Sequence, residues 1–320
     1  MKIQNLSIQR IPKPFDYRYH YELKDDTLTK SIKEQGILNP VWLINKNGVK
    51  IIDGHRRWQA AKKTGLTKIP VHLYSASDLS RIFISAVHLN LTSGKLTPIE
   101  KLKILHLAWQ LIDNHTYKEA SRILELSNVP NIVGIFSEMM AAPYWLQEYF
   151  FQTNMSLKIL EKIIHYPMNR YRPWFKVASS LRLNGIELIQ LLEGAGDISR
   201  REPVEITKLY HLLELEKLLS SNITISQKIQ QIKKTMYEWR YPVLHRVNEY
   251  ILENINSLPK SFRNKFQISW DKTLEQSGIV LSFRMNLVND LKNACEIISS
   301  REIQTKLDRL VKQISNSSQQ

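Results

Sequence analysis

Residues 40–65, PVWLINKNGVKIIDGHRRWQAAKKTG, constrain the fold more than any other stretch of this chain. Two apolar runs, PVWLI and VKIID, flank NKNG, and an Asn-Gly pair between such runs is typical of a β-hairpin. The second run passes directly into HRRWQAAKKTG, which predicts a helix closed by Gly65. LTKSIKEQG predicts an earlier short helix ending at Gly36, and KIPVHLY predicts a later strand. A small mixed α/β domain is therefore expected.

The chain beyond about residue 78 has mostly helical periodicity. TPIEKLKILHLAWQLI begins with Thr97 as a predicted N-cap, Pro98 at the first helical position and Glu100 three residues after the cap. TYKEASRILELSNVPNIVGIFSEMM predicts two helices with helix-turn-helix spacing. We expect connections at 168–175 and 194–203. KFQISWDKTLEQSGIVLSFRM then predicts two strands around a polar turn, followed by one or two amphipathic helices.

These patterns predict an α+β protein with four regions. They are a mixed α/β domain at 1–95, a helix-turn-helix domain at 96–168, a helical region at 169–257 and a small α/β unit at 258–320. Apolar positions on the last helices predict either a homodimer seam or an ordinary core face: Leu291, Ile298, Leu307, Leu310 and Ile314.

The net charge of +15 at pH 7 narrows the class of partner. It favours polyanions such as nucleic acid, nucleotides or an acidic lipid surface, although basic residues also serve plain solubility. Cys295 is the one cysteine, so we expect no internal disulfide and a cytoplasmic location. No apolar run approaches the roughly 18 residues of a membrane span, so no membrane partner is expected.

The block Asp53-Gly54-His55-Arg56-Arg57 predicts an anion site at the strand-to-helix junction. Gly54 lets backbone approach a ligand, and the free N–H groups of a helix start attract phosphate. Arg56 and Arg57 supply guanidinium groups suited to phosphate oxygens, and His55 can donate a hydrogen bond. Asp53 has three readings: it fixes His55, caps the helix or holds a metal ion. In the plainer alternative, Asp53 is only an N-cap and the arginines are a solvated face.

The same residues carry a resemblance to a known family. LTKSIKEQGILNPVWLI, VKIIDGHRRWQAAKKTGLTKIPVHLY and LNLTSGKLTPIEK together resemble the N-terminal domain of ParB-like chromosome and plasmid partition proteins over residues 5–105. The helix pair at 116–165 is similar in spacing to the central DNA-binding domain of that family. About half of the chain is covered.

The resemblance implies a nucleotide site, because family members bind and hydrolyse CTP while they load on DNA. Gly54, Arg56 and Arg57 would contact phosphates, and the run Gly36 to Pro40 would lie near the base. Most members carry glutamate where this chain has His55. The predicted nucleotide-binding residues are Gly36, Pro40, Asp53, Gly54, His55, Arg56, Arg57 and Asn90.

The second phosphate motif of the family, Glu-Asn-x-x-Arg, is degraded here. Asn90 is kept, but Leu89 replaces the glutamate and Ser93 replaces the arginine. These changes remove expected metal and triphosphate ligands. The sequence therefore leaves open whether CTP or another nucleotide binds with Mg²⁺, and whether any nucleotide is hydrolysed.

Two enzymes are the alternatives. Free-serine kinases of the same fold carry Asp-Gly-His-His-Arg, which this chain matches at Asp53, Gly54, His55 and Arg57, with Glu22 as the nearest candidate base. A nuclease would need clustered carboxylates on a metal ion. The first domain offers Asp53 with Asp16, Glu22, Asp25 and Asp26, while the histidines show no metal-ligand spacing.

DNA is the expected partner of the helix-turn-helix. Base-reading residues would lie at the start of its second helix, at Ser127, Asn128 and Asn131, and backbone contacts on its first helix, at Lys118 and Arg122. A pair of helices used only for packing is the alternative. Further contacts are predicted where basic residues alternate with aromatic ones that either stack on bases or belong to the core: Arg170, Arg172 and Lys176 among Tyr166, Tyr171, Trp174 and Phe175.

Overall fold

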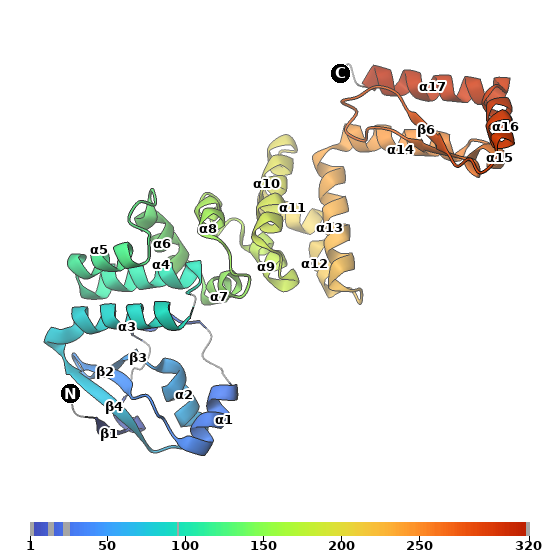
Figure 1. Cartoon of the computed structure of the whole chain (residues 1–320). Helices are drawn as coiled ribbons and strands as arrows, with labels where there is room; N and C mark the ends of the chain where they lie inside the picture. Colours follow the sequence, from blue (N-terminus) through green and yellow to red (C-terminus); the bar gives the residue numbers. More distant parts are fainter. Residues whose placement is uncertain (1–2, 12–15, 22–25, 95, 318–320) are drawn as a thin grey trace. The chain divides into compact units, whose positions relative to one another are not determined.

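The computed structural model describes residues 3–11, 16–21, 26–94 and 96–317. It is an α+β fold whose chain divides into two compact units, residues 1–193 with 206–219 and residues 194–205 with 220–320. Figure 1 shows the elements in chain order.

A four-stranded sheet in the order β1-β4-β2-β3 organises the N-terminal part of the first unit. Strands β2 and β4 are parallel, whereas β1 with β4 and β2 with β3 are antiparallel. Left-handed φ angles of 52° at Asn47 and 101° at Gly48 close the predicted β2–β3 hairpin. The strands are β1 (Gln4–Ser7), β2 (Val41–Asn45), β3 (Val49–Asp53) and β4 (Lys68–Ser75).

The two faces of this sheet build two separate cores. Because successive strand residues point to opposite faces, Leu43 and Ile51 pack against helices α1 (Asp26–Gln35) and α2 (His55–Lys63). Their neighbours Ile44 and Ile52 pack against α3 (Leu79–Ser93) on the other face. The sheet is thus covered on both sides, as Figure 1 shows for α3 and for α1 with α2.

Local signals in the sequence set most helix ends. Gly36 at φ 73° follows α1, and Gly65 at φ 79° follows α2, as predicted. Thr97 and Glu100 form a capping box at the start of α4 (Pro98–Leu107). The predicted ends are thus confirmed. They could be predicted because capping and left-handed termination depend on residues within one helical turn.

Helices form the rest of the first unit. The two helices of the predicted helix-turn-helix are α5 (Asn114–Ile123) and α6 (Ile132–Ala141), and a π-helical turn η3 (Ala108–Ile112) precedes them. Short 3-10 helices η1 (Ile8–Arg10) and η2 (Ala76–Asp78) lie earlier in the chain. The remaining helices are α7 (Tyr144–Gln152), α8 (Leu157–Ile163), α9 (Arg172–Leu181), α11 (Ile206–Leu212) and α12 (Leu215–Ser220).

Two predicted connections are helical and need correction. The stretch 194–203 is mostly part of α10 (Gly185–Arg201), and this helix continues through Gly194 and Gly196. A Cβ on Gly194 would lie 2.8 Å from Met236 Cε, so this glycine serves close helix packing and does not mark a break. Within 168–175, α9 already begins at Arg172, with Pro173 in its first turn, where proline is tolerated.

The second unit contains the predicted strand pair. Strands β5 (Phe266–Ser269) and β6 (Val280–Phe283) are antiparallel and pack with α15 (Lys260–Arg263). The other helices are α13 (Ile225–Arg240), α14 (Pro242–Asn256), α16 (Val288–Ile298) and α17 (Arg301–Ser317). In the part of the chain that the structure describes, no helix has the length and apolarity needed to cross a bilayer.

The apolar stripe of the last helices faces the core of this unit. Leu310 and Ile314 are buried with Ile251, and Leu307 and Ile298 pack against the neighbouring core. Leu291 is the exception and is largely exposed. The core-face reading is therefore confirmed for four of the five positions, while the homodimer seam stays a prediction.

Candidate functional site

Gly54 makes the turn from β3 into α2. Its φ of 93° lies in the left-handed region that favours glycine, and it is the N-cap residue of α2. A Cβ at this position would lie 3.1–3.2 Å from the guanidinium of Arg57. Two features thus favour glycine at this position: the left-handed backbone and the close approach of the Arg57 guanidinium.

The half-buried Arg57 side chain is held against the domain by hydrogen bonds. Its Nη1 donates to the carbonyl oxygens of Asn39 at 2.6 Å and Pro40 at 2.9 Å, and its Nη2 donates to Asp53 Oδ2 at 2.5 Å. Three acceptors therefore fix this guanidinium, which joins the loop before β2 to the end of β3. Asn39 and Pro40, at the end of the Gly36–Pro40 run, are thus joined to the arginine block by direct hydrogen bonds.

The other members of the block differ in exposure. Asp53 is 7% exposed and His55 is 3% exposed, so both belong to the interior. Arg56 is exposed at the first turn of α2. Of the two arginines, Arg56 therefore offers the more accessible guanidinium beside the start of the helix.

Asn90 joins the block from the opposite side of the domain. Its Nδ2 lies 3.1 Å from Asp53 Oδ1, 2.8 Å from Tyr19 Oη and 2.8 Å from the Ala86 carbonyl oxygen. Its Oδ1 lies 3.1 Å from His20 Nε2. A carboxylate and a carbonyl can only accept, so the amide must point its NH₂ group toward them. Burial raises the pKa of the Tyr19 phenol well above its ordinary value.

His20 extends this network to α4. Its Nδ1 lies 2.9 Å from Glu100 Oε1, while Glu100 Oε2 accepts from the Thr97 backbone N–H at 2.9 Å and from the Thr97 hydroxyl at 2.8 Å. Burial acts to raise the pKa of Glu100, but the hydrogen bonds from His20 and Thr97 outweigh it and hold that pKa below its ordinary value. Both ring nitrogens of His20 thus lie within hydrogen-bond distance of a side-chain oxygen.

A continuous polar chain therefore runs from Arg57 through Asp53, Asn90 and His20 to Glu100. Sequence reasoning found Arg57, Asp53 and Asn90 and assigned Glu100 only to a helix cap; it missed Tyr19 and His20. No sequence signal pairs His20 with Glu100, because 80 residues separate them.

The helix pair α5–α6 presents its predicted DNA contacts to solvent. Lys118 and Arg122 are exposed on α5, and Ser127 and Asn128 are exposed in the turn before α6. Asn131 is the left-handed N-cap of α6, with φ 49°. Its side chain lies over Gly134, where a Cβ would approach it to 2.5 Å. A side chain folded onto its own helix would have to rotate away before it could reach a base edge.

The basic-aromatic stretch separates into an outer and an inner set. Arg170, Arg172 and Lys176 are exposed. Trp174 and Phe175 are fully buried, and Trp174 Nε1 donates to the Ile206 carbonyl oxygen at 3.1 Å. Tyr171, Trp174 and Phe175 therefore belong to the core, whereas Tyr166 is only half-buried.

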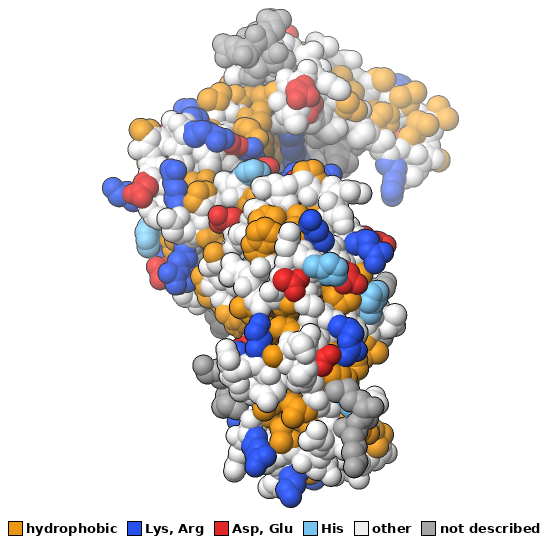
Figure 2. Space-filling view, turned by 90° about the vertical axis from the view of Figure 1, so that its left-hand side faces the viewer, with side chains coloured by type: hydrophobic (Ala, Val, Ile, Leu, Met, Phe, Trp, Pro, Cys, Tyr) orange, Lys and Arg blue, Asp and Glu red, His pale blue; other side chains and the backbone are white. Residues whose placement is uncertain are grey.

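Charge on the visible surface is dispersed. Figure 2 shows Lys and Arg side chains in small groups over one face of the molecule, interspersed with acidic and hydrophobic side chains. Within the described ranges, no group of three or more His, Cys, Asp or Glu side chains is arranged to hold a metal ion.

The enzyme alternatives gain no support from this geometry. Asp53 is bonded to both Arg57 and Asn90, so its carboxylate is already engaged. Lys50 pairs with Asp16 at 2.7 Å, and Lys63 pairs with Asp26 at 3.1 Å. The other candidate carboxylates, Glu22 and Asp25, lie outside the described residues.

Comparison with known proteins gives a family for the first domain. Residues 1–88 match the family model of the ParB N-terminal domain. A probable chromosome-partitioning protein ParB from Neisseria meningitidis is 25% identical over 162 residues, which cover 49% of this chain and 55% of the relative. The chromosome-partitioning protein ParB of Myxococcus xanthus is 36% identical over 85 residues, which cover 26% of this chain and 28% of the relative.

A nucleoid occlusion protein from Geobacillus kaustophilus is 28% identical over 146 residues, or 44% of this chain and 50% of the relative. The chain thus spans about half the length, or less, of these curated relatives. A crystal structure of C-terminally truncated ParB from Caulobacter crescentus with CTP-γ-S covers 52% of this chain and 94% of its own, at 18% identity and a TM-score of 0.26.

Proposed function

We propose that this protein, which carries a ParB N-terminal domain at residues 1–88, is a ParB-like DNA-binding protein that acts in chromosome or plasmid partition or in related regulation. The domain and its arginine block are the observation that carries the proposal. The names of the relatives, chromosome-partitioning and nucleoid occlusion proteins, support the same class of function.

The proposed nucleotide site lies at the start of α2. Its phosphate ligands are the first backbone N–H groups of that helix and the exposed Arg56 guanidinium. Arg57 acts indirectly, because it holds the loop that contains Asn39 and Pro40 against the block. This loop, which begins at Gly36, is the proposed neighbour of the base.

The residues of the block do not fit a metal ion held by the protein. The carboxylate of Asp53 is bonded to Arg57 and Asn90, and Leu89 stands where the family motif has a glutamate. The proposal is therefore binding of CTP or another nucleotide, with any Mg²⁺ held by the phosphates. Hydrolysis is not part of it.

DNA is the proposed partner of the helix-turn-helix formed by α5 and α6. Lys118 and Arg122 would contact phosphates, with Arg170, Arg172 and Lys176 as further exposed cations. Ser127, Asn128 and Asn131 would read base edges. The protein would act in the cytoplasm as a homodimer, in which bound nucleotide changes how two N-terminal domains associate and so how the protein grips DNA.

Calorimetric titration of the full chain with Mg-CTP, then with ATP and ADP, tests the nucleotide site. We expect binding by the wild type and at least about a ten-fold loss of affinity in Arg56→Ala, because a charge-assisted hydrogen bond contributes about 1.5–3 kcal/mol. Lys62→Ala is the matched control, since it removes an exposed cation from the last turn of the same helix.

The outcomes separate the parts of the proposal. Equal loss in Arg56→Ala and Lys62→Ala would mean that general charge, and not the block, attracts the nucleotide. No binding of any nucleotide, with duplex DNA absent or present, would remove the nucleotide site and leave a DNA-binding protein whose block serves the fold.

A further inference from the structure

A groove in the first unit lies outside the arginine block. It has a volume of about 1030 Å³, at the upper end of the roughly 300–1,000 Å³ typical of small-molecule sites. Side chains from the 16–21 segment, α2, α7 and the end of α9 contribute to it. Its main lining residues are Arg18, Tyr21, Tyr144, Glu148, Phe151 and Arg182.

Three aromatic rings form one wall of this groove. The ring centroids of Tyr144 and Tyr21 are 5.9 Å apart, and those of Tyr21 and Phe151 are 5.6 Å apart with an interplanar angle of 30°. Tyr21 is buried, and its hydroxyl donates to Gln147 Oε1 at 2.7 Å. This hydrogen bond anchors the Tyr21 ring to α7. Tyr144 remains 45% exposed. A planar ligand would therefore meet the accessible Tyr144 ring, which is tilted by 34° against the buried Tyr21 ring behind it.

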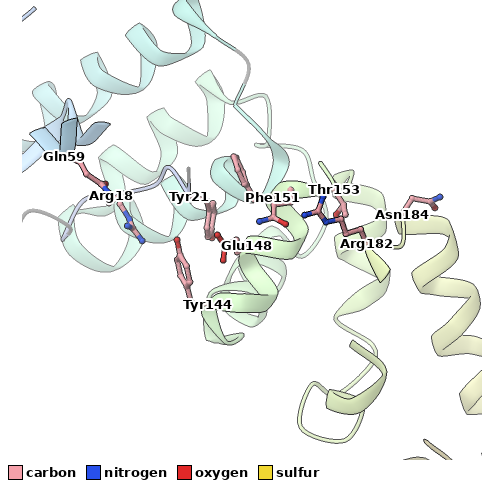
Figure 3. A pocket seen from close by; sticks show the side chains of 10 residues that line it. Arg18, Tyr21, Gln59, Tyr144, Glu148, Phe151, Thr153, Arg182 and Asn184 are labelled. Atoms are coloured by element: carbon pink, nitrogen blue, oxygen red, sulfur yellow. The ribbon is translucent and has the colours of Figure 1, made fainter. Parts of the chain in front are cut away.

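An arginine lies on either side of these rings, as Figure 3 shows. Arg18 Cζ lies 5.6 Å from the centroid of the Tyr144 ring. Arg182, at the far side, is the C-cap of α9 and has a left-handed φ of 52°. This position favours glycine, so the chain keeps an arginine where a smaller residue would fit the backbone better.

Between the two arginines, Glu148 is the acidic side chain among the described lining residues. Its carboxylate can accept hydrogen bonds from the amino groups of a base. A phosphate would avoid it and lie beside Arg18 or Arg182. The order of charges along the groove is thus cation, aromatic rings with a carboxylate, and cation.

Positive charge also lies behind the rings. Lys103 Nζ is 4.4 Å from the centroid of the Tyr21 ring. Burial, and then the charge of Arg18, lower the pKa of Lys103 to about 8, against the opposing effect of the Glu100 carboxylate; His106 also lies close to this lysine. An anion bound beside Arg18 would offset that repulsion and favour the charged lysine.

We propose that this groove binds a short segment of single-stranded nucleic acid, with a base on the exposed Tyr144 ring and phosphates at Arg18 and Arg182. Duplex DNA fits less well, because its bases are already stacked and paired, whereas single-strand sites combine aromatic platforms with backbone cations. A single nucleotide would engage one arginine and leave much of the volume unfilled.

Fluorescence anisotropy of the full chain with a labelled 12-nucleotide oligo-dT tests this site. We expect Tyr144→Ala to weaken binding by about ten-fold, which is within the range for loss of one base–aromatic stack. Tyr250→Ala is the matched control, because Tyr250 is similarly exposed on α14. It should bind the oligonucleotide as the wild type does.

Arg182→Gly separates binding from folding. Glycine relieves the left-handed backbone, so the melting temperature should stay the same or rise while affinity falls. The plot of log affinity against log salt should flatten by about 0.7 for the lost phosphate contact. Binding should also take up protons near pH 8, so affinity should fall as pH rises through the Lys103 titration.

The groove proposal and the proposed function fail in different experiments. Tyr144→Ala should retain Mg-CTP and duplex binding. Wild-type affinity for oligo-dT in Tyr144→Ala and Arg182→Gly would overturn the groove proposal, as would full competition by CTP or by an equal mass of duplex. Preference for an acidic peptide over oligo-dT would also overturn it.

Discussion

At the scale of single residues, the arginine block stabilises the fold in addition to forming the proposed ligand site. Arg57 is fixed by two carbonyl oxygens and the Asp53 carboxylate, so its guanidinium cannot move without breaking hydrogen bonds. Gly54 passes close beneath it. The glycine was predicted from its value to a ligand, yet the contact with Arg57 shows that the fold also requires it.

We expect Gly54→Ala to destabilise the first unit more than Gly48→Ala. Both glycines have left-handed φ angles, and an L-residue there costs about 1–2 kcal/mol. A Cβ at Gly48 meets nothing within 4 Å, whereas one at Gly54 must displace Arg57, which adds about 1–3 kcal/mol as overpacking does. Scanning calorimetry of both variants measures the difference. Equal melting temperatures would show that Arg57 yields freely.

At the scale of residues, the sequence predicts contacts only between residues that are close together in the chain. The block itself was visible because Asp53 to Arg57 are contiguous. The sequence does not reveal the bond between Asn90 and Asp53, or the bonds from His20 to Asn90 and Glu100. The bonded residues are 37 to 80 positions apart in the chain. Such pairings depend on how α3, α4 and the 16–21 segment pack.

At the scale of elements, the α5–α6 pair formed as its sequence predicted. Asp113 caps α5 by accepting from the Thr116 backbone N–H at 2.7 Å, and buried Ile132, Ile135 and Phe136 hold α6 against the domain. The predicted phosphate-contacting cations on the exposed side of this pair are only Lys118 and Arg122. Any affinity for DNA through this element should therefore depend on few phosphate contacts.

Salt dependence of duplex binding measures those contacts. We expect Lys118→Ala and Arg122→Ala each to flatten the slope of log affinity against log salt by about 0.9, because each cation that contacts B-DNA releases counterions. Lys312→Ala is the control, since Lys312 on α17 pairs with Asp308 at 2.8 Å. A slope unchanged in both α5 variants would assign the pair to packing alone.

At the scale of the whole molecule, the chain forms two compact units that share α10. The second unit has its own core, in which Phe262 is fully buried and its ring centroid lies 4.6 Å from that of Phe266. Separate cores predict separate unfolding transitions, because cooperativity follows shared packing.

We expect Phe262→Ala to lower one calorimetric transition and leave the other in place. Loss of a buried phenylalanine typically costs about 3–5 kcal/mol. Leu43→Ala, in the sheet core of the first unit, should lower the other transition instead. Movement of both transitions in either variant would show that the units unfold as one.

The sequence by itself determined the α+β class, the β2–β3 hairpin, the glycine-closed helices, the Thr97–Glu100 cap and the position of the arginine block. Each depends on residues a few positions apart, where backbone sterics and capping hydrogen bonds operate. Tertiary structure alone decided that Arg57 bonds to the loop before β2, that Trp174 and Phe175 join the core, and that α10 continues past Gly194. It also brought Arg18, Tyr144 and Arg182 around one groove, because only packing joins segments so distant in sequence.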